Sequence, residues 1–270
     1  MGKMTAETAK TKTILISKQL KLSGKTVDLT EMLSRKCKIS REYRQEELDK
    51  FELDKRWMQK DMCQFKVAPV DSFDCTKYCD GNIAVLNFAS SKNPGGGFEV
   101  GAMAQEESLC YRSNLWQVLS KHESFYEFNR QHLNRNLYSD GIIYSEKIVV
   151  FRNAKLANTE PVYQNVITCA APNAKAALKN GVKQETIDLV MRRRLEEIFK
   201  VAIINKVKHL VLGAFGCGVF GNNPETVSEI MRELLVDNEY GRYFKQVTFA
   251  MHDSVGANTR AFVKTFNKIK

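Results

Sequence analysis

The sequence predicts an α/β fold, in which a mixed and mostly parallel sheet carries helices on both faces. Short apolar runs alternate with helical patterns along the chain after residue 80, and such alternation is typical of parallel sheets. The runs are apolar at consecutive positions, as in strands that are buried on both faces. Two glycine-rich stretches each follow one of these runs, which is where ligand-binding loops lie in open α/β sheets.

The first 75 residues are dense in charge and poor in glycine. We expect them to form a helical accessory segment that packs on the main domain, residues 76–270. Apolar spacing favours helices over residues 5–22 and 46–62. The sequence from Asp28 to Glu31 resembles a capping box before another short helix.

The main domain is expected to contain five strands and four helices. The strands are the apolar runs, and the helices show apolar residues at helical spacing between them. The expected strands are 83–88, 147–151, 165–170, 209–214 and 246–251, and the expected helices are 105–120, 184–205, 224–236 and 257–268.

Composition narrows the class of protein. With 270 residues and 43% hydrophobic residues the chain can bury a full core. It contains no apolar stretch long enough to cross a membrane, and its polar N-terminus does not resemble a secretory signal. The seven cysteines are odd in number, which favours reduced thiols and an intracellular location. Cys75 and Cys79 have no second pair nearby, so we expect no metal site there.

The formal net charge of +10 suits a polyanionic partner. Nucleic acid, a phosphorylated metabolite and an acidic polymer all fit this charge, and so does a role in solubility alone. Arg192, Arg193 and Arg194 are consecutive in an expected helix, so they point in different directions and indicate a solvated face. No sequence signature of nucleic-acid binding is present, and no specific nucleic-acid partner is expected.

The two glycine-rich stretches, residues 93–101 and 213–223, predict a cleft lined by backbone N–H groups. Such groups beside helix N-termini are suited to binding a pyrophosphate. Neither stretch matches a dinucleotide-binding or P-loop motif, which disfavours a Rossmann dehydrogenase or an NTPase. Glycines between a strand and a helix can also serve tight turns alone.

Glu106 and Glu107 are adjacent at the start of an expected helix. Neighbours on a helix point roughly 100° apart, so the two carboxylates can face two parts of one ligand. Cleavage of a glycosidic bond needs an acid that protonates the leaving oxygen. The alternative is that both acids only interact favourably with the helix dipole.

Gly95-Gly96-Gly97, seven further residues and Gln105-Glu106-Glu107 resemble the signature of poly(ADP-ribose) glycohydrolases. Residues 86–90, 166–173 and 213–220 resemble the bacterial-type (microbial) branch, and the likeness runs from about residue 27 to residue 252. The resemblance implies a macrodomain-like three-layer sandwich with residues 76–270 as the catalytic domain. It also implies hydrolysis of ribose–ribose bonds from the ends of poly(ADP-ribose), with release of ADP-ribose.

The resemblance further implies roles for individual residues. Glu107 matches the catalytic acid, and Glu106 matches the partner that holds the ribose hydroxyls. Residues 216–221 match a diphosphate loop in which Phe220 lies beside the ribose. Neither a metal nor another cofactor is implied. The full set of expected substrate-binding residues is Asn93, Gly95, Gly96, Gly97, Gln105, Gly216, Cys217, Gly218, Val219, Phe220 and Gly221.

Other functions fit the same cleft. The chain could remove single ADP-ribose units from protein side chains, or it could be a non-catalytic ADP-ribose reader, although a reader has no need of both acids. ADP-ribosylated proteins are the expected partners, and a monomer is the default expectation.

Overall fold

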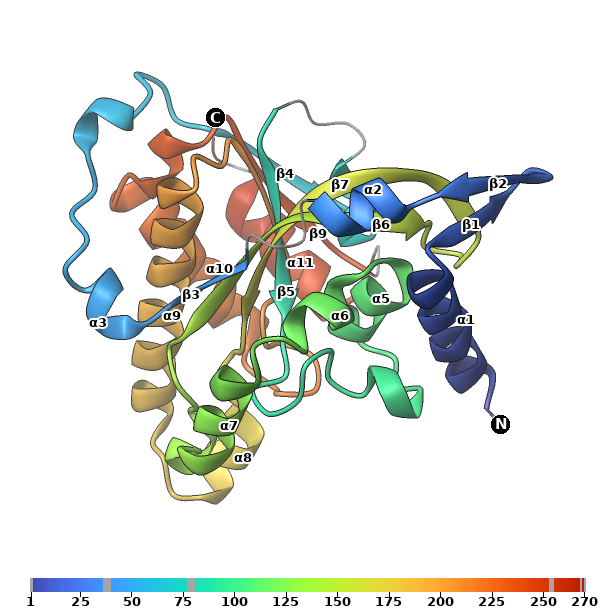
Figure 1. Cartoon of the computed structure of the whole chain (residues 1–270). Coiled ribbons are helices and arrows are strands. Elements are labelled where there is room, and N and C mark those ends of the chain that lie inside the picture. The colour runs from blue at the N-terminus through green and yellow to red at the C-terminus, as the bar shows by residue number, and fades with distance from the viewer. Residues whose placement is uncertain (1, 36–39, 77–80, 253–254, 268, 270) are drawn as a thin grey trace.

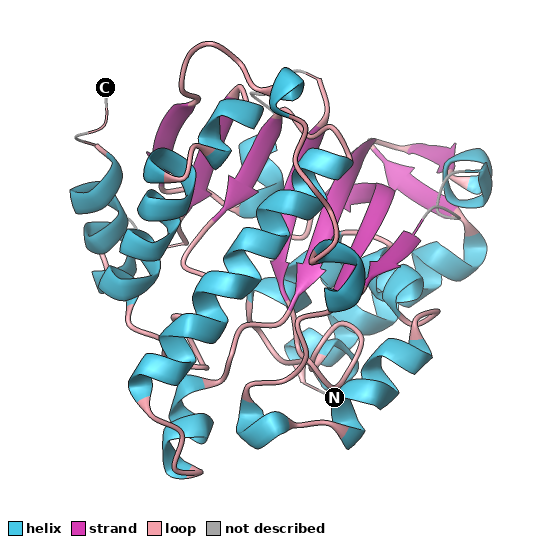
Figure 2. Ribbon diagram, turned by 90° about the vertical axis from the view of Figure 1, so that its left-hand side faces the viewer, coloured by secondary structure: helices cyan, strands magenta, loops and turns pink. Residues whose placement is uncertain are grey.

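A seven-stranded sheet forms the centre of the protein, and helices cover both of its faces (Figures 1 and 2). The structure is a computed structural model that describes residues 2–35, 40–76, 81–252, 255–267 and 269. From one edge to the other, the strands are β3 (Ser40–Tyr43), β6 (Ile142–Arg152), β7 (Asn158–Cys169), β5 (Ile83–Phe88), β8 (His209–Leu212), β9 (Gln246–Ala250) and β4 (Gln64–Ala68).

The sheet is mixed and mostly parallel, as predicted. Strands β7, β5, β8, β9 and β4 form four successive parallel pairs. Strand β6 is antiparallel to β7, and the edge strand β3 is antiparallel to β6. The consecutive apolar residues of β5 explain its central place, because they fill both sides of the sheet: Ala84 and Leu86 belong to one core and Val85 to the other.

Each face of the sheet has its own hydrophobic core. One core packs against α9 (Gln184–Ile204), α10 (Pro224–Arg232) and α11 (Ala257–Phe266). The other packs against α1 (Lys3–Ser17), α5 (Gln105–Arg112), α6 (Leu115–Leu119) and α7 (Glu123–Gln131). In Figure 1, α9 and α10 lie on one side of the strands, and α1, α5 and α6 lie on the other. This arrangement confirms the expected three layers.

Two helices of the main domain differ from their predicted extents. The helix expected over 105–120 is two helices, because Ser113 is extended and bridges to Val150 of β6. The helix expected over 224–236 begins as α10 and continues as a turn of π-helix, Glu233–Asp237. The shorter α8 (Ala174–Lys179) was not predicted. The expected end of the last helix, Lys268, lies outside the described residues.

The N-terminal segment begins with a helix, but strands follow it. The helix expected over 5–22 ends at Ser17, because Lys18 adopts a left-handed conformation with φ 54°. Strands β1 (Gln19–Leu22) and β2 (Lys25–Asp28) then form a hairpin. Asp28 accepts a hydrogen bond from the backbone N–H of Thr30, at the start of α2 (Thr30–Arg35).

The prediction of a continuous helix over residues 46–62 is wrong. Only α3 (Gln45–Leu48) and one 3-10 turn (Lys55–Trp57) form there. Leu48, Leu53 and Met58 contact the same core separately from a largely irregular segment, so their helical spacing does not produce a continuous helix.

The first 75 residues also supply both edges of the central sheet, through β3 and β4. The shorter α4 (Ser72–Cys75) follows β4. Neither edge strand was predicted, because each has an alternating or partly exposed pattern rather than a run of buried residues. The division of the chain at residue 75 stays a prediction. No helix in the described part of the chain is both long and apolar enough to span a bilayer.

Candidate active site

The two glycine-rich loops lie at the same edge of the sheet, as predicted. Strands β5 and β8 are parallel neighbours, so the loops that follow them begin side by side. The rings of Phe88, at the end of β5, and Phe215, after β8, meet edge to face with centroids 5.8 Å apart. The two loops therefore share a packed base.

Glycine is required at Gly96 because two carboxylates occupy the place of a side chain. Gly96 has φ +59°, a left-handed conformation. A Cβ atom there would lie 2.4 Å from Oε1 of Glu107 and 3.0 Å from Oε2 of Glu106. Gly95 is similarly enclosed, since its Cβ would meet Trp116 at 2.9 Å. The turn thus brings both glutamates against one stretch of backbone.

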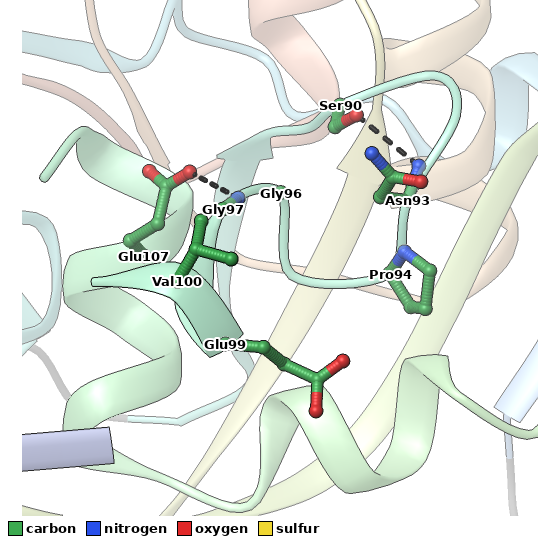
Figure 3. Close-up of a pocket in the computed structure, with 8 residues that line it drawn as sticks. All are labelled: Ser90, Asn93, Pro94, Gly96, Gly97, Glu99, Val100 and Glu107. Atoms are coloured by element: carbon green, nitrogen blue, oxygen red, sulfur yellow. Dashed lines mark hydrogen bonds between the residues drawn. The ribbon is translucent and has the colours of Figure 1, made fainter. Parts of the chain in front are cut away.

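Glu107 presents its carboxylate at the edge of a pocket. Its Oε1 accepts a hydrogen bond from the backbone N–H of Gly97 at 2.7 Å, and its Oε2 accepts one from Ala104 at 2.9 Å. Figure 3 shows the carboxylate against the Gly96–Gly97 backbone, with Asn93 and Pro94 on the other side. Backbone donors to both oxygens fix the carboxylate in position.

Glu106 is hidden behind the same turn and is only 2% exposed. It accepts hydrogen bonds from Asn87 Nδ2 at 3.2 Å and from the backbone N–H of Ser90 at 2.6 Å. Burial raises the pKa of Glu106 to about 8, because it disfavours the charged form more than these hydrogen bonds favour it. The protonated form of Glu106 is therefore favoured relative to that of an exposed glutamate.

The pocket beside Glu107 has a volume of about 480 Å³, within the usual range for small-molecule sites. Three predicted residues of the first loop line it together with Glu107. The other four lining residues were not predicted, because they are ordinary in type and only the shape of the turn brings them to the pocket. The lining consists of Ser90, Asn93, Pro94, Gly96, Gly97, Glu99, Val100 and Glu107 (Figure 3).

Gln105 lies next to the pocket but does not line it. Its amide nitrogen donates to the carbonyl of Leu86 at 2.8 Å, and its amide oxygen accepts from the backbone N–H of Phe88 at 2.9 Å. These contacts fasten the start of α5 to the end of β5. The predicted contact of Gln105 with substrate stays a prediction.

The second loop stands apart from the lining of this pocket. A Cβ atom on Gly216, which has φ +72°, would lie 2.6 Å from Ala171. Gly218 has open space around its Cβ position, and Val219 is 77% exposed. Cys217 is partly buried, and burial raises the pKa of its thiol to about 12. This loop is therefore closely packed at Gly216 and open at Gly218 and Val219.

Two residues outside the predicted set contact the second loop. The ring of Tyr138 packs on that of Phe220 at 6.2 Å between centroids. The methylene stem of Lys175 covers Gly221, whose Cβ would lie 2.6 Å from Lys175 Cε. Lys175 is far from this loop in the sequence, so no local sequence pattern predicts that it contacts the loop.

Cysteine and histidine side chains show no arrangement suited to a metal in the described parts of the chain. Cys63, Cys110, Cys169 and Cys217 are thiols, whereas Cys37 and Cys79 lie outside the described residues. His122 joins β3 to the start of α7, through hydrogen bonds of 2.7 Å to Glu42 and 2.7 Å to Ser40.

The fold and the site define an α/β protein whose carboxylate pocket is built on the first of two neighbouring glycine-rich loops, which follow parallel strands of the sheet. The family profile described as "Microbial-type PARG, catalytic domain" matches residues 8–153, where PARG denotes poly(ADP-ribose) glycohydrolase. The chain belongs to the microbial-type PARG family.

Solved structures of bacterial PARG proteins are similar to the chain over nearly its whole length. The enzyme from Thermomonospora curvata superposes with a TM-score of 0.90 and 32% identity, over 97% of this chain and 99% of that one. The same enzyme bound to the inhibitor ADP-HPD gives 0.88 at 32% identity, with the same coverage. The enzyme from Deinococcus radiodurans in complex with ADP-ribose gives 0.78 at 33% identity, over 92% and 98%. No curated protein sequence matches the chain significantly.

Proposed function

We propose that this glycohydrolase cleaves ribose–ribose bonds from the ends of poly(ADP-ribose), with Glu107 as the general acid and base. Membership of the PARG family gives the reaction class, hydrolysis of poly(ADP-ribose) glycosidic bonds. The observation that carries the residue assignment is the position of the two glutamates. Glu107 lines the pocket, whereas Glu106 lies behind Gly96 and outside the lining.

The position of Glu107 in the pocket lining supports this role. Glycoside hydrolysis needs a carboxyl group that protonates the leaving oxygen, and a carboxylate that then activates water. One group can perform both steps in turn, because the proton it gives up leaves the base that the water needs. Glu107 is held by two backbone N–H groups at the pocket edge, so a substrate meets it in a fixed orientation.

Glu106 supports this reaction from behind the turn. Burial raises the pKa of Glu106 to about 8, which favours its neutral form. A neutral carboxyl group also has a proton with which to donate a hydrogen bond, which supports the proposed contact with ribose hydroxyls. Opening of its bonds to Asn87 and Ser90 would accompany that contact.

The second loop is proposed to hold the diphosphate. Gly216 and Gly221 both have positive φ, and Gly218 leaves the backbone open to an approaching ligand. The neighbouring Lys175 adds a positive charge on this side of the sheet. ADP-ribosylated proteins are the proposed carriers of the substrate, and the protein is proposed to act as a monomer inside the cell.

Product analysis tests this proposal directly. The protein is incubated with poly(ADP-ribose) of defined length, and products are separated by size over time. Attack at chain ends predicts free ADP-ribose from the first time point and gradual shortening of the polymer. Early appearance of medium-length oligomers would contradict attack at ends. Release only from mono-modified protein would favour the mono-ADP-ribose hydrolase, and binding without release would favour a reader.

A further inference from the structure

Residues 134–138 form a turn that is almost entirely left-handed. Asn134, Arg135, Asn136 and Tyr138 have φ of 44°, 51°, 69° and 63°. Asparagine tolerates this conformation, but arginine and tyrosine adopt it rarely because their Cβ atoms crowd the backbone. A residue in such a conformation costs free energy, so it persists only where the surrounding structure enforces it. Residues of this kind cluster at functional sites.

A fully buried arginine enforces the turn. The solvated position expected for Arg194 of α9 is wrong, because its side chain is 0% exposed and donates to the carbonyl of Leu137 at 2.9 Å. It also donates to Asp140 at 2.7 Å and to the carbonyl of Ala170, directly after β7, at 2.7 Å. One guanidinium group therefore ties the turn to the same edge of the sheet from which the glycine loops emerge.

The strained turn is connected to the second glycine loop by a ring contact and by backbone hydrogen bonds. Tyr138 is 6% exposed and packs its ring on Phe220. The carbonyl of Asn136 accepts a hydrogen bond from the backbone N–H of Asn173, which caps α8. In the first turn of α8, the backbone N–H of Lys175 donates to the carbonyl of Phe220 at 3.1 Å. The turn therefore contacts the ring of Phe220 directly and is linked to its backbone through the start of α8.

We propose that the left-handed turn 134–138 positions Phe220 for substrate, and that Tyr138 is the positioning residue through which it acts. The inference rests on the proposed function and on the place beside the ribose that the family resemblance implies for Phe220. Tyr138 packs against Phe220 and limits the space into which that ring can swing. The strain is retained because a relaxed turn would move Tyr138 away from Phe220.

Side-chain variants test the contact. Affinity for ADP-ribose is measured by calorimetry, and KM and kcat are measured on poly(ADP-ribose). Tyr138→Leu is expected to weaken ADP-ribose binding about tenfold and to raise KM, with kcat nearly unchanged. Tyr138→Phe keeps the ring and is expected to bind as the unmodified protein does. In a Phe220→Leu background, Tyr138→Leu should cause no further loss, because coupled residues are not additive.

Backbone variants separate positioning from general stability. Asn136→Val places a β-branched residue at φ 69° and is expected to lower both the melting temperature and the affinity for ADP-ribose. Lys206→Val imposes the same conformational strain at φ 56°, away from the loops, and is expected to lower the melting temperature alone.

Equal affinities of Asn136→Val and Lys206→Val would overturn the inference, and so would full additivity of Tyr138→Leu and Phe220→Leu. An unmodified protein that neither binds ADP-ribose nor releases it would instead contradict the proposed function itself. The two failures are therefore distinguishable.

Discussion

Gly96 leaves the space that the two glutamates occupy. Replacement by alanine would place a methyl group 2.4 Å from Oε1 of Glu107, so the carboxylate must move from its backbone donors. We expect Gly96→Ala to lower kcat/KM on poly(ADP-ribose) by at least about a hundredfold, the scale at which misplaced catalytic groups lose rate.

Gly181→Ala is the matched control. Gly181 also has positive φ, +74°, but nothing lies within 4 Å of its Cβ position, so it should lose some stability without losing activity. Activity of Gly96→Ala equal to that of Gly181→Ala would contradict the steric account.

The buried carboxyl of Glu106 makes stability depend on pH. Its pKa is raised from an ordinary 4.5 to about 8 in the folded protein, so the folded state keeps a proton that the unfolded state releases. This contribution is complete below about pH 4.5 and is lost as pH rises toward 8. The free energy of unfolding should fall across this window, with a share from Glu106 of up to about 1.4 kcal/mol per pH unit.

Urea denaturation of the unmodified protein and of Glu106→Gln at pH 5, 6, 7 and 8 checks this expectation. Glu197 is also buried, and its pKa is raised to about 8, so the comparison between the two proteins isolates the part due to Glu106. The variant should show a shallower dependence on pH. Parallel curves would show that Glu106 does not keep its proton.

Sequence and structure agree on the first loop because its residues are close in the chain. The spacing from Gly95 to Glu107 places glycines and acids within one turn and one helix start. Tyr138 and Lys175 could not be found in this way. Their contacts with Phe220 and Gly221 join parts of the chain that only the packing of α8 and α9 brings together.

At the scale of elements, α1 supports the pocket loop from outside. Thr8 Oγ1 donates to the carbonyl of Phe98 at 2.6 Å in a buried position. Lys12 pairs with Glu99 at 2.5 Å, and a Cβ on Gly101 would lie 3.0 Å from the backbone nitrogen of Thr5. The loop between Gly97 and α5 therefore rests on the N-terminal helix.

Thr8→Val keeps the shape of the side chain but leaves the carbonyl of Phe98 without this donor. The loss of such a bond costs about 1–3 kcal/mol when the remaining partner stays buried. We expect lower stability and a fall of about tenfold in kcat/KM, measured on poly(ADP-ribose). Thr13→Val, in the same helix, loses only a bond to the carbonyl of Ala9 at an exposed position and should behave like the unmodified protein. Equal activity of the two variants would contradict support by α1.

Apolar runs predicted the central strands well, because a strand that is buried on both faces of a sheet has apolar residues at consecutive positions. Antiparallel pairing between β6 and β7 extends these strands well beyond their apolar cores, and no local pattern marks the added residues. The helix expected over 46–62 was wrong for the opposite reason, since its apolar residues have helical spacing but pack separately.

At the scale of the whole molecule, the N-terminal 75 residues are joined to the main domain through both edges of the sheet. Strand β4 pairs with β9 over five residues, and β3 pairs with β6 over four. A fragment of residues 76–270 would expose the edges of β6 and β9 and the surfaces that α1 covers. Unpaired edges of this kind promote aggregation.

We therefore expect the 76–270 fragment to aggregate or to unfold without a cooperative transition. Circular dichroism during heating and size-exclusion chromatography check this, with the full chain as control. A soluble fragment that melts cooperatively near the temperature of the full chain would instead support an independent domain that begins at residue 76.

The central claim is that the chemistry depends on Glu107. The most direct measurement compares ADP-ribose release from poly(ADP-ribose) and ADP-ribose binding in the unmodified protein, Glu107→Gln and Glu185→Gln. Glu185 is an exposed acid in the first turn of α9 and serves as the control. The account predicts that Glu107→Gln loses release by at least about a thousandfold, as removal of an essential catalytic group does, while binding is retained. Release by Glu107→Gln at the rate of Glu185→Gln would contradict it.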